Sequence, residues 1–254
     1  MDQNEIRPVF ILGFPRSGTT VMTTTIISLE GFWGCNRRVE GMWIQHFGLL
    51  FNPESNLERS SVLQDPKKFE IFKDCFARFA DDFWRKAYGH PDGRWVDKTP
   101  DFAQIDSVTM IKQLFPHARY IFMYRNPYKC MMSNCIAWSH LRQDISRLAK
   151  RWAEVMNQWR NVRRELPQES YCEIYQGKLQ EQLGLLAPLL GLSLQKHNEM
   201  KEFVNKNRFP VKQYKREIYE NFLFTEKEKN KINNMIKHEI LHWPELVKGV
   251  SLPG

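Results

Sequence analysis

The chain has 254 residues, 42% of them hydrophobic and 13% aromatic, a composition that excludes a disordered chain and suits one α/β domain over residues 1–254. Its formal net charge is +8, but lysines and arginines are interspersed with acids and no nucleic-acid-binding module is recognisable, so we expect no nucleic-acid partner. The basic charge instead favours attraction of a highly anionic small ligand.

The first predicted element is an apolar strand that runs into a glycine-bounded loop, in the sequence PVFILGFPRSGTT at residues 8–20. A helix from Thr19 to Ser28 follows, so free backbone N–H groups and the positive end of the helix dipole meet at the loop and predict a phosphate or sulfate cradle. The glycine spacing is that of the nucleotide-triphosphate loop G-x-x-x-x-G-K-[ST], but Thr19 takes the place of the lysine. Arg16 supplies a cation within the loop instead, so we expect an anionic ligand other than Mg-ATP.

Between this loop and the next motif we expect another loop, two helices and a short strand. Residues 31–38 are predicted to form a loop that returns over the anion site. A long amphipathic helix is predicted from Lys67 to Tyr88, with phenylalanines every three or four residues, a pattern typical of core packing. These phenylalanines are Phe69, Phe72, Phe76, Phe79 and Phe83. A strand at Arg94–Val96 and a helix at Ser107–Leu114 then lead to the next motif.

A second sequence of strand, polar turn and helix lies at residues 118–134. Tyr120–Tyr124 is a strand of the buried type, and Pro127 suits the first turn of the helix that follows. Arg125 closes the strand, and Ser133 lies two turns into the helix, so the pair can hold one phosphate through charge-assisted hydrogen bonds and a hydroxyl. Two separate anion sites predict a ligand that is phosphorylated at two places.

The rest of the chain continues the alternation of helices and strands. A long charged helix is predicted at Asp144–Leu166, with Trp152 and Trp159 packed inward. The later elements are a strand at Tyr171–Tyr175, a helix near Leu179–Leu190 and mostly helical structure from His197 to about Leu241. This order predicts a mainly parallel central sheet flanked by helices, with ligands at the carboxyl ends of its strands. Since Gly13, Lys98 and Arg125 each stand at such an end, we expect them to meet in one crevice.

In order along the chain, these motifs resemble those of sulfotransferases that use 3′-phosphoadenosine 5′-phosphosulfate (PAPS). Pro15–Thr20 resembles the family's 5′-phosphosulfate loop, and Arg125 with Ser133 resembles its 3′-phosphate motif. Between them, Trp95–Pro100 (WVDKTP) is similar to the W-x-D-K-T-P strand end of the bacterial and tyrosylprotein branches. The resemblance extends over residues 8–138.

The resemblance implies a single P-loop-like domain that moves a sulfuryl group from PAPS to a hydroxyl or amine of a small-molecule acceptor, a natural product or a carbohydrate. The product would be 3′,5′-ADP, and no metal would be required. Arg16 would neutralise the charge that grows on the bridging oxygen, and Lys98 would assist unless it is a solvated lysine in the turn before Pro100. The cofactor-binding residues that the resemblance implies are Pro15, Arg16, Ser17, Gly18, Thr19, Thr20, Arg125 and Ser133.

The acceptor must lose a proton, so a general base is expected within hydrogen-bond reach of it. In the tyrosylprotein branch this base is a glutamate shortly after the first helix, and in the cytosolic branch it is a histidine further on. Glu40 is our first candidate. His46 is the second candidate; alternatively, it is a polar residue on a helix without a catalytic role.

Further cofactor contacts are implied by two later segments. Residues 173–179 (EIYQGKL) are similar to the family's R-Y-E-D-L strand end, with Gln-Gly in place of the acidic pair. Tyr175 or Trp33 would support the adenine ring, and core packing is the alternative for each. Lys206 and Arg208 belong either to a segment that closes over PAPS or to a solvated basic loop.

The five cysteines form no CxxC pair and no metal-ligand spacing with histidine, which favours reduced thiols and a cytoplasmic protein. The first strand begins by about Pro8, and the apolar stretches are far shorter than the roughly 20 residues of a membrane helix. We therefore expect neither a signal peptide nor a membrane anchor.

Two other functions share parts of the pattern. A P-loop small-molecule kinase would use the same cradle, but it needs Mg²⁺ and the lysine that Thr19 replaces. A non-catalytic nucleotide-binding protein would account for the basic charge, but not for two anion sites at neighbouring strand ends. The sulfotransferase hypothesis accounts for both features.

Overall fold

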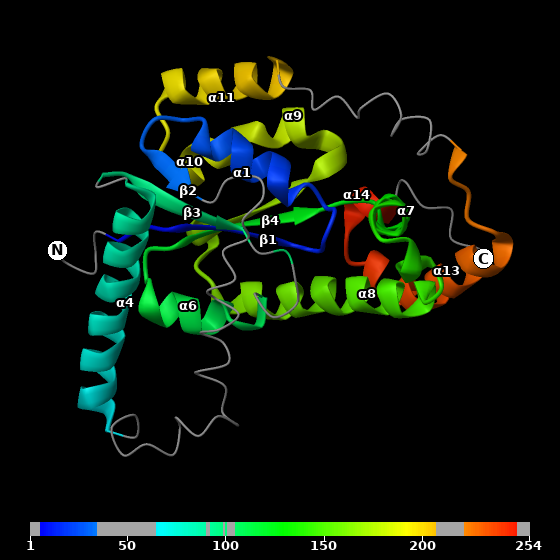
Figure 1. Ribbon diagram of the computed structural model, residues 1–254, viewed down its shortest axis with the longest axis horizontal. Coiled ribbons are helices and arrows are strands. Elements are labelled where there is room, and N and C mark those ends of the chain that lie inside the picture. The colour runs from blue at the N-terminus through cyan, green and yellow to red at the C-terminus, as the bar shows by residue number, and fades with distance from the viewer. Residues whose placement is uncertain are drawn as a thin grey trace.

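The structure, a computed structural model, describes residues 6–34, 65–89, 92–98, 100, 105–206 and 221–247. Within these residues, five parallel strands form one sheet in the order β2-β3-β1-β4-β5 (Figure 1). The strands are β1 (Val9–Gly13), β2 (Phe32–Gly34), β3 (Arg94–Lys98), β4 (Arg119–Tyr124) and β5 (Tyr171–Tyr175). The prediction of an α/β fold with a parallel central sheet is confirmed.

Helices cover both faces of the sheet (Figure 1). On one face lie α1 (Thr19–Ile27), α9 (Leu179–Gln182), α10 (Leu186–Leu190) and α11 (Leu194–Lys206). Against the other pack α4 (Pro66–Tyr88), α6 (Val108–Leu114) and α8 (Ile145–Val162). Helix α13 (Glu226–Ile240) packs on α8, α7 (Pro127–Ala137) stands at the carboxyl edge, and α14 (Pro244–Val247) follows α13. Side chains alternate along β1, so Phe10 and Leu12 join the core beneath α8, and Val9 and Ile11 join the core beneath α1.

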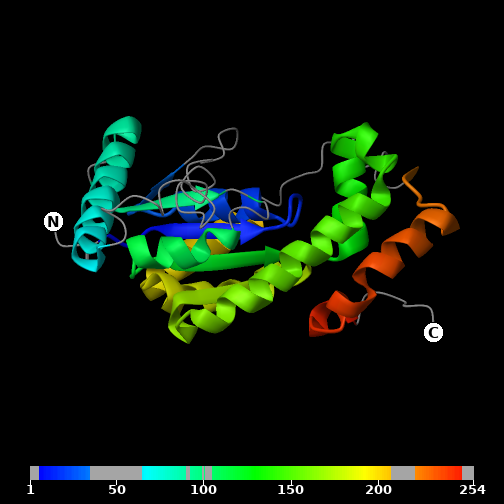
Figure 2. The ribbon, with the colours of Figure 1, turned by 90° about the horizontal axis from the view of Figure 1, so that it is seen from below.

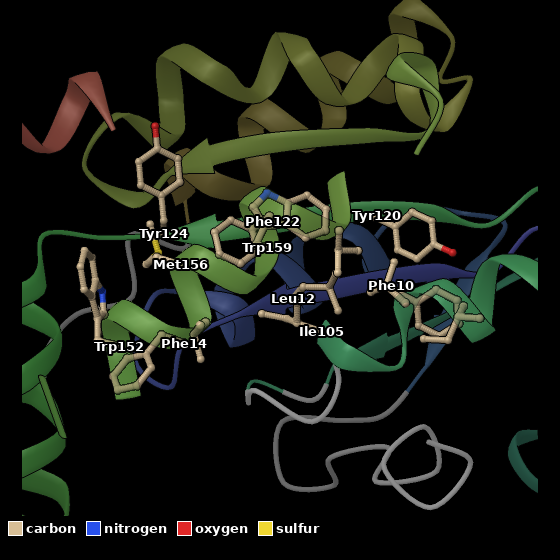
Figure 3. Packing of buried hydrophobic residues seen from close by; sticks show 14 of the residues in the cluster. Phe10, Leu12, Phe14, Ile105, Tyr120, Phe122, Tyr124, Trp152, Met156 and Trp159 are labelled. Atoms are coloured by element: carbon tan, nitrogen blue, oxygen red, sulfur yellow. The ribbon is translucent and has the colours of Figure 1, made fainter. Parts of the chain in front are cut away.

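Aromatic rings fill the core between the sheet and α8 (Figure 3). Trp159 stacks on Phe122 with the ring centroids 4.8 Å apart, and Trp152 and Trp159 are fully buried, as predicted. The indole Nε1 of Trp159 donates a hydrogen bond of 2.7 Å to Glu173 Oε1, which satisfies its polar atom inside the protein. This packing fixes α8 against β4, the strand that leads into Arg125.

Two arginine–glutamate pairs fasten α13, which lies alongside α8 (Figure 2), one to α8 itself and one to the 3-10 turn Ser139–Arg142 before it. Arg160 donates to both carboxylate oxygens of Glu239 at 2.9 and 3.0 Å, and this buried carboxylate also accepts from Trp243 Nε1 at 3.0 Å. Near the other end of α13, Arg142 donates to both oxygens of Glu228 at 2.8 and 3.2 Å, and this hydrogen bonding lowers the pKa of Glu228 to about 2. Because both pairs are bidentate, they fix the orientation of α13 as well as its position.

The segment predicted as a loop at residues 31–38 contains the edge strand β2. This strand pairs in parallel with β3, and Trp33 lies opposite Trp95. Gly34 permits the close approach, because a Cβ there would lie 2.2 Å from the carbonyl oxygen of Val96. A three-residue strand shows no periodic pattern, so the sequence did not reveal it.

The buried face of α4 differs from the predicted phenylalanine stripe. Ala77, Ala80 and Trp84 are buried, whereas Phe79 is 59% exposed and Phe83 is 39% exposed. Consecutive helical residues lie about 100° apart around the axis, so a buried stripe through positions 80 and 84 turns positions 79 and 83 away from the core. The prediction of core packing is therefore wrong for Phe79 and Phe83.

Candidate active site

A cleft of about 500 Å³ opens at the carboxyl edge of the sheet, where four strands end. The loop after β1 forms its centre, Pro100 comes from the β3 side, Arg125 follows β4, and Gln176 follows β5. The residues that line the cleft are Pro15, Arg16, Gly18, Thr19, Thr20, Val21, Pro100, Arg125, Ser133, Trp138 and Gln176. The predicted convergence of the β1 loop with Arg125 is therefore observed.

The backbone of the β1 loop is shaped to present amide groups. Gly13 has φ 143°, and a Cβ on it would lie 2.3 Å from the carbonyl oxygen of Met123, so only glycine fits between β1 and β4. Gly18 caps the start of α1 without a side chain, which leaves the first N–H groups of that helix without a side-chain cap. These N–H groups and the helix dipole make the start of α1 suited to an anion.

Arg16 is held in an uncommon conformation at the centre of this loop. Its φ of 72° is the only positive φ of a non-glycine residue in the described part of the chain. The guanidinium of Arg125 donates to the Arg16 carbonyl oxygen at 3.2 Å, and Asn134 Nδ2 donates to the Pro15 carbonyl oxygen at 3.1 Å. Contacts from the end of β4 and from α7 thus hold the loop in this form.

The side chains of Arg16, Arg125 and Ser133 form a cationic cluster in the cleft. Arg16 Nε donates to Ser133 Oγ at 2.9 Å, and within the described residues the buried Nε of Arg125 has no hydrogen-bond partner. Among the described residues, neither arginine pairs with a carboxylate. Beneath them, burial raises the pKa of the Cys130 thiol to about 12 although both arginines lower it, so this thiol is neutral. Two guanidinium groups that have no carboxylate partner in the described ranges suit a bound anion such as a phosphate.

Several predicted site residues lie away from the cleft lining. The Ser17 hydroxyl is buried and turns toward Gly13, where a Cβ would lie 2.8 Å from it. Lys98 is only 5% exposed as the last residue of β3, so its interpretation as a solvated lysine in a turn is wrong. Tyr175 is half-buried and packs on Tyr124 at 5.3 Å between ring centroids.

The remaining candidates are at the end of α11 or outside the described residues. Lys206 is exposed and pairs with Glu202 at 3.3 Å, and it does not line the cleft. Glu40, His46 and Arg208 lie outside the described residues.

Four residues that line the cleft were not predicted as site residues: Val21, Pro100, Trp138 and Gln176. Gln176 follows β5 directly, and its side chain packs on the loop, because a Cβ on Gly18 would lie 2.9 Å from Gln176 Cγ. The strand-end rule that located Arg125 also applies to Gln176, which directly follows β5 although its side chain carries no charge. Trp138 ends α7 and follows no motif, so no local signal placed it in the cleft.

No group of three or more histidine, cysteine, aspartate or glutamate side chains in the described ranges is arranged to hold a metal ion. Likewise, no helix in those ranges has the length and apolar character needed to cross a bilayer.

Comparisons with known proteins agree with this fold. The sulfotransferase domain of the Synechococcus PCC 7002 olefin synthase is 15% identical, with a TM-score of 0.53 and coverage of 98% of each chain. Sulfotransferase STF9 from Mycobacterium avium is 17% identical, with a TM-score of 0.51 and coverage of 92% of this chain and 76% of that one. The sulfotransferase domain from the curacin biosynthetic pathway is 16% identical, with a TM-score of 0.51 and coverage of 92% and 97%.

These structural likenesses concern the fold alone, because the identities are low. Among curated proteins, none matches this chain. A family model described as "Sulfotransferase family" matches residues 8–184, which contain the β1 loop, Arg125, Ser133 and Gln176. On this match, the chain belongs to the sulfotransferase family.

Proposed function

We propose that this enzyme transfers a sulfuryl group from PAPS to a hydroxyl or amine of a small-molecule acceptor and releases 3′,5′-ADP. The observation that carries the proposal is the pairing of two anion-binding elements in one cleft. One is the uncapped start of α1 at Gly18, and the other is the cluster of Arg16, Arg125 and Ser133. A ligand with phosphate groups at both ends of a nucleoside would use both elements at once.

When bound, PAPS supplies the activated sulfuryl group. The first amides of α1, with Thr19 and Thr20, would hold its 5′-phosphate, and Arg125 with Ser133 would hold its 3′-phosphate. Sulfuryl transfer, by analogy with phosphoryl transfer, depends on alignment and on stabilisation of charge. Arg16 belongs to the loop that leads into α1, and its Nε reaches Ser133 across the cleft lining, which supports its proposed role of neutralising the oxygen that leaves.

Other proposed roles rest on the family motifs. Lys98 would add positive charge from the neighbouring strand end, and Ser17 would contribute to the 5′-phosphate site through the loop backbone. The nucleotide would also be contacted by Tyr175, Lys206 and Arg208. Lys206 is the last residue of α11. The acceptor would lose its proton to Glu40, or to His46 if Glu40 does not serve.

The first test is independence from metal ions. Because the loop has no clamp lysine, we expect sulfuryl transfer from radiolabelled PAPS to acceptors in a metabolite extract to continue in excess EDTA. In a parallel thermal-shift assay, 3′,5′-ADP should stabilise the protein and Mg-ATP should not, since only a ligand that binds the folded state raises its stability. Complete loss of activity in EDTA with recovery in Mg²⁺ would favour a kinase instead.

The second test concerns the 3′-phosphate. Arg125→Ala should weaken binding of 3′,5′-ADP by about 1.5 to 3 kcal/mol, the range for a hydrogen bond to a charged group. Binding of 5′-AMP should change little, because this ligand lacks the 3′-phosphate. Ser133→Ala should show the same selectivity to a smaller degree. Isothermal titration calorimetry on both nucleotides measures this, and equal weakening of both would remove Arg125 from the 3′-phosphate site.

A further inference from the structure

The loop after β1 contains a turn of a type that arginine rarely occupies. Ser17 N donates to the Phe14 carbonyl oxygen at 3.1 Å, which closes a β-turn with Pro15 and Arg16 as its two central residues. Proline cannot adopt a positive φ, and Arg16 has a φ of 72°, so the turn is of type II. The second central position of this turn type favours glycine or asparagine, and an arginine there is strained.

The alternative for this sequence is a type I turn. Both types accept proline at the first central position, and they differ by reversal of the peptide unit between the two central residues. In a type I turn Arg16 would have a negative φ, which any residue adopts without strain. An interaction with this central peptide unit is therefore needed to hold the turn in its observed form.

Asn134, on the helix at the carboxyl edge of the sheet (Figure 1), makes that interaction. Its Nδ2 donates to the carbonyl oxygen of Pro15 at 3.1 Å, and this carbonyl belongs to the central peptide unit. The same Nδ2 donates to the Cys130 carbonyl oxygen, one turn earlier in α7, at 2.9 Å. Since the second bond anchors the amide in the helix, a reversed peptide unit would lose the first one. The bond from Arg125 reaches the Arg16 carbonyl oxygen, outside this unit.

The same helix also holds the side chain of Arg16. Ser133, the residue before Asn134, accepts a hydrogen bond from Arg16 Nε at 2.9 Å. Arg16 is exposed, so packing alone does not fix its side chain. Reversal of the central peptide unit would change the φ of Arg16 by roughly 160° and, with it, the direction of the side chain. Two neighbouring residues of α7 thus hold Arg16, one through the backbone and one through the guanidinium.

We infer that Asn134 is a positioning residue for sulfuryl transfer: it holds the turn at Pro15 and Arg16 in the type II form and so directs the Arg16 guanidinium toward the oxygen that leaves. This inference rests on the proposed function. Asn134 is only 2% exposed and is not one of the residues that line the cleft, so its effect on the reaction passes through Arg16 and not through contact with PAPS.

Two substitutions separate this role from a role within the helix. Asn134→Ala removes both hydrogen bonds, whereas Asn134→Ser is too short to reach Pro15 but can still donate to the Cys130 carbonyl oxygen, as helical serines do four residues back. Each should lower the single-turnover rate constant about tenfold, the upper range for one hydrogen bond, with radiolabelled PAPS bound and a metabolite extract as acceptor. In calorimetry, binding of 3′,5′-ADP should weaken less than about threefold, because Arg125 and the start of α1 remain.

A double-mutant cycle tests whether Asn134 acts through Arg16. In the Arg16→Ala enzyme, the addition of Asn134→Ala should change the rate constant less than about twofold, because the group that it positions is absent. A crystal structure of the Asn134→Ser protein should show a negative φ at Arg16. The control Asn157→Ala removes an exposed asparagine of α8 that bonds Arg160, and it should leave the rate constant unchanged.

The wild-type protein separates the outcomes. If it neither binds 3′,5′-ADP nor transfers a sulfuryl group from PAPS, the proposed function fails and this inference fails with it. If it does both, the inference alone is overturned by any of three results: a wild-type rate constant for Asn134→Ser, additive losses in the double mutant, or a positive φ at Arg16 in the Asn134→Ser structure.

Discussion

Arg16→Ala is expected to reduce kcat for sulfuryl transfer about 100- to 1,000-fold, equivalent to about 3 to 4 kcal/mol, as for the loss of a single donor at an oxyanion. The loss should appear at every pH between about 6 and 9, because the missing group stabilises charge and does not act as an acid or a base. The structure supports this expectation through the position of Arg16, whose Nε reaches Ser133 from the centre of the loop. Single-turnover kinetics with bound PAPS measures the chemical step directly.

Two control variants accompany this measurement. Arg16→Lys keeps the charge but loses the planar fork, and we expect a smaller reduction than for alanine. Arg78→Ala removes an exposed arginine of α4 that pairs with Asp74, and its kcat should equal that of the wild type. An Arg16→Ala enzyme with unchanged kcat would show that Arg16 serves binding or structure only.

Gly13→Ala should destabilise the fold by about 2 to 6 kcal/mol, the combined range for backbone strain and overpacking. A Cβ at this position would lie 2.3 Å from the Met123 carbonyl oxygen and 2.8 Å from Ser17 Oγ, at a φ of 143° that alanine rarely adopts. The matched control is Gly191→Ala, where φ is also positive but no atom lies within 4 Å of the added Cβ.

We expect Gly191→Ala to cost about 1 to 2 kcal/mol from strain alone. Urea denaturation of the three proteins gives the free energies of unfolding. Equal losses for the two alanine variants would show that the crowding at Gly13 is relieved by a small shift of β4.

The sequence predicted the parts of the fold that follow from strong local patterns. The apolar runs of β1 and β4 are buried on both sides, and the loops that follow them carry motif residues, so the sheet and the convergence of the β1 loop with Arg125 were predictable. Where the sequence pattern is short or weak, packing determines where the helices and strands begin and end. The predicted helix near Leu179–Leu190 is divided by a 3-10 turn at Leu183–Leu185, whose short leucine-rich sequence gives no boundary signal.

The candidate site shows the same division. Residues within a motif, such as Arg16 and Ser133, could be placed from spacing, because the loop and the helix fix where they lie. Trp138 lies in the cleft at the end of α7, and Asn134 ties this helix to Pro15 through a contact across 119 residues that no local pattern encodes. For Lys98 the sequence predicted the strand but not the burial of the side chain, which depends on neighbours from distant segments.

The two arginine–glutamate pairs that fasten α13 affect how the chain is completed during synthesis. Glu239 and Glu228 meet arginines 79 and 86 residues earlier, and Trp243 packs on Tyr124 at 4.8 Å between ring centroids. The residues that line the cleft all lie between positions 15 and 176, so the ribosome makes them before α13, the helix that covers this core. Until then the apolar face of α8 has no cover from α13, and a stalled or truncated chain would offer this face to chaperones or to aggregation.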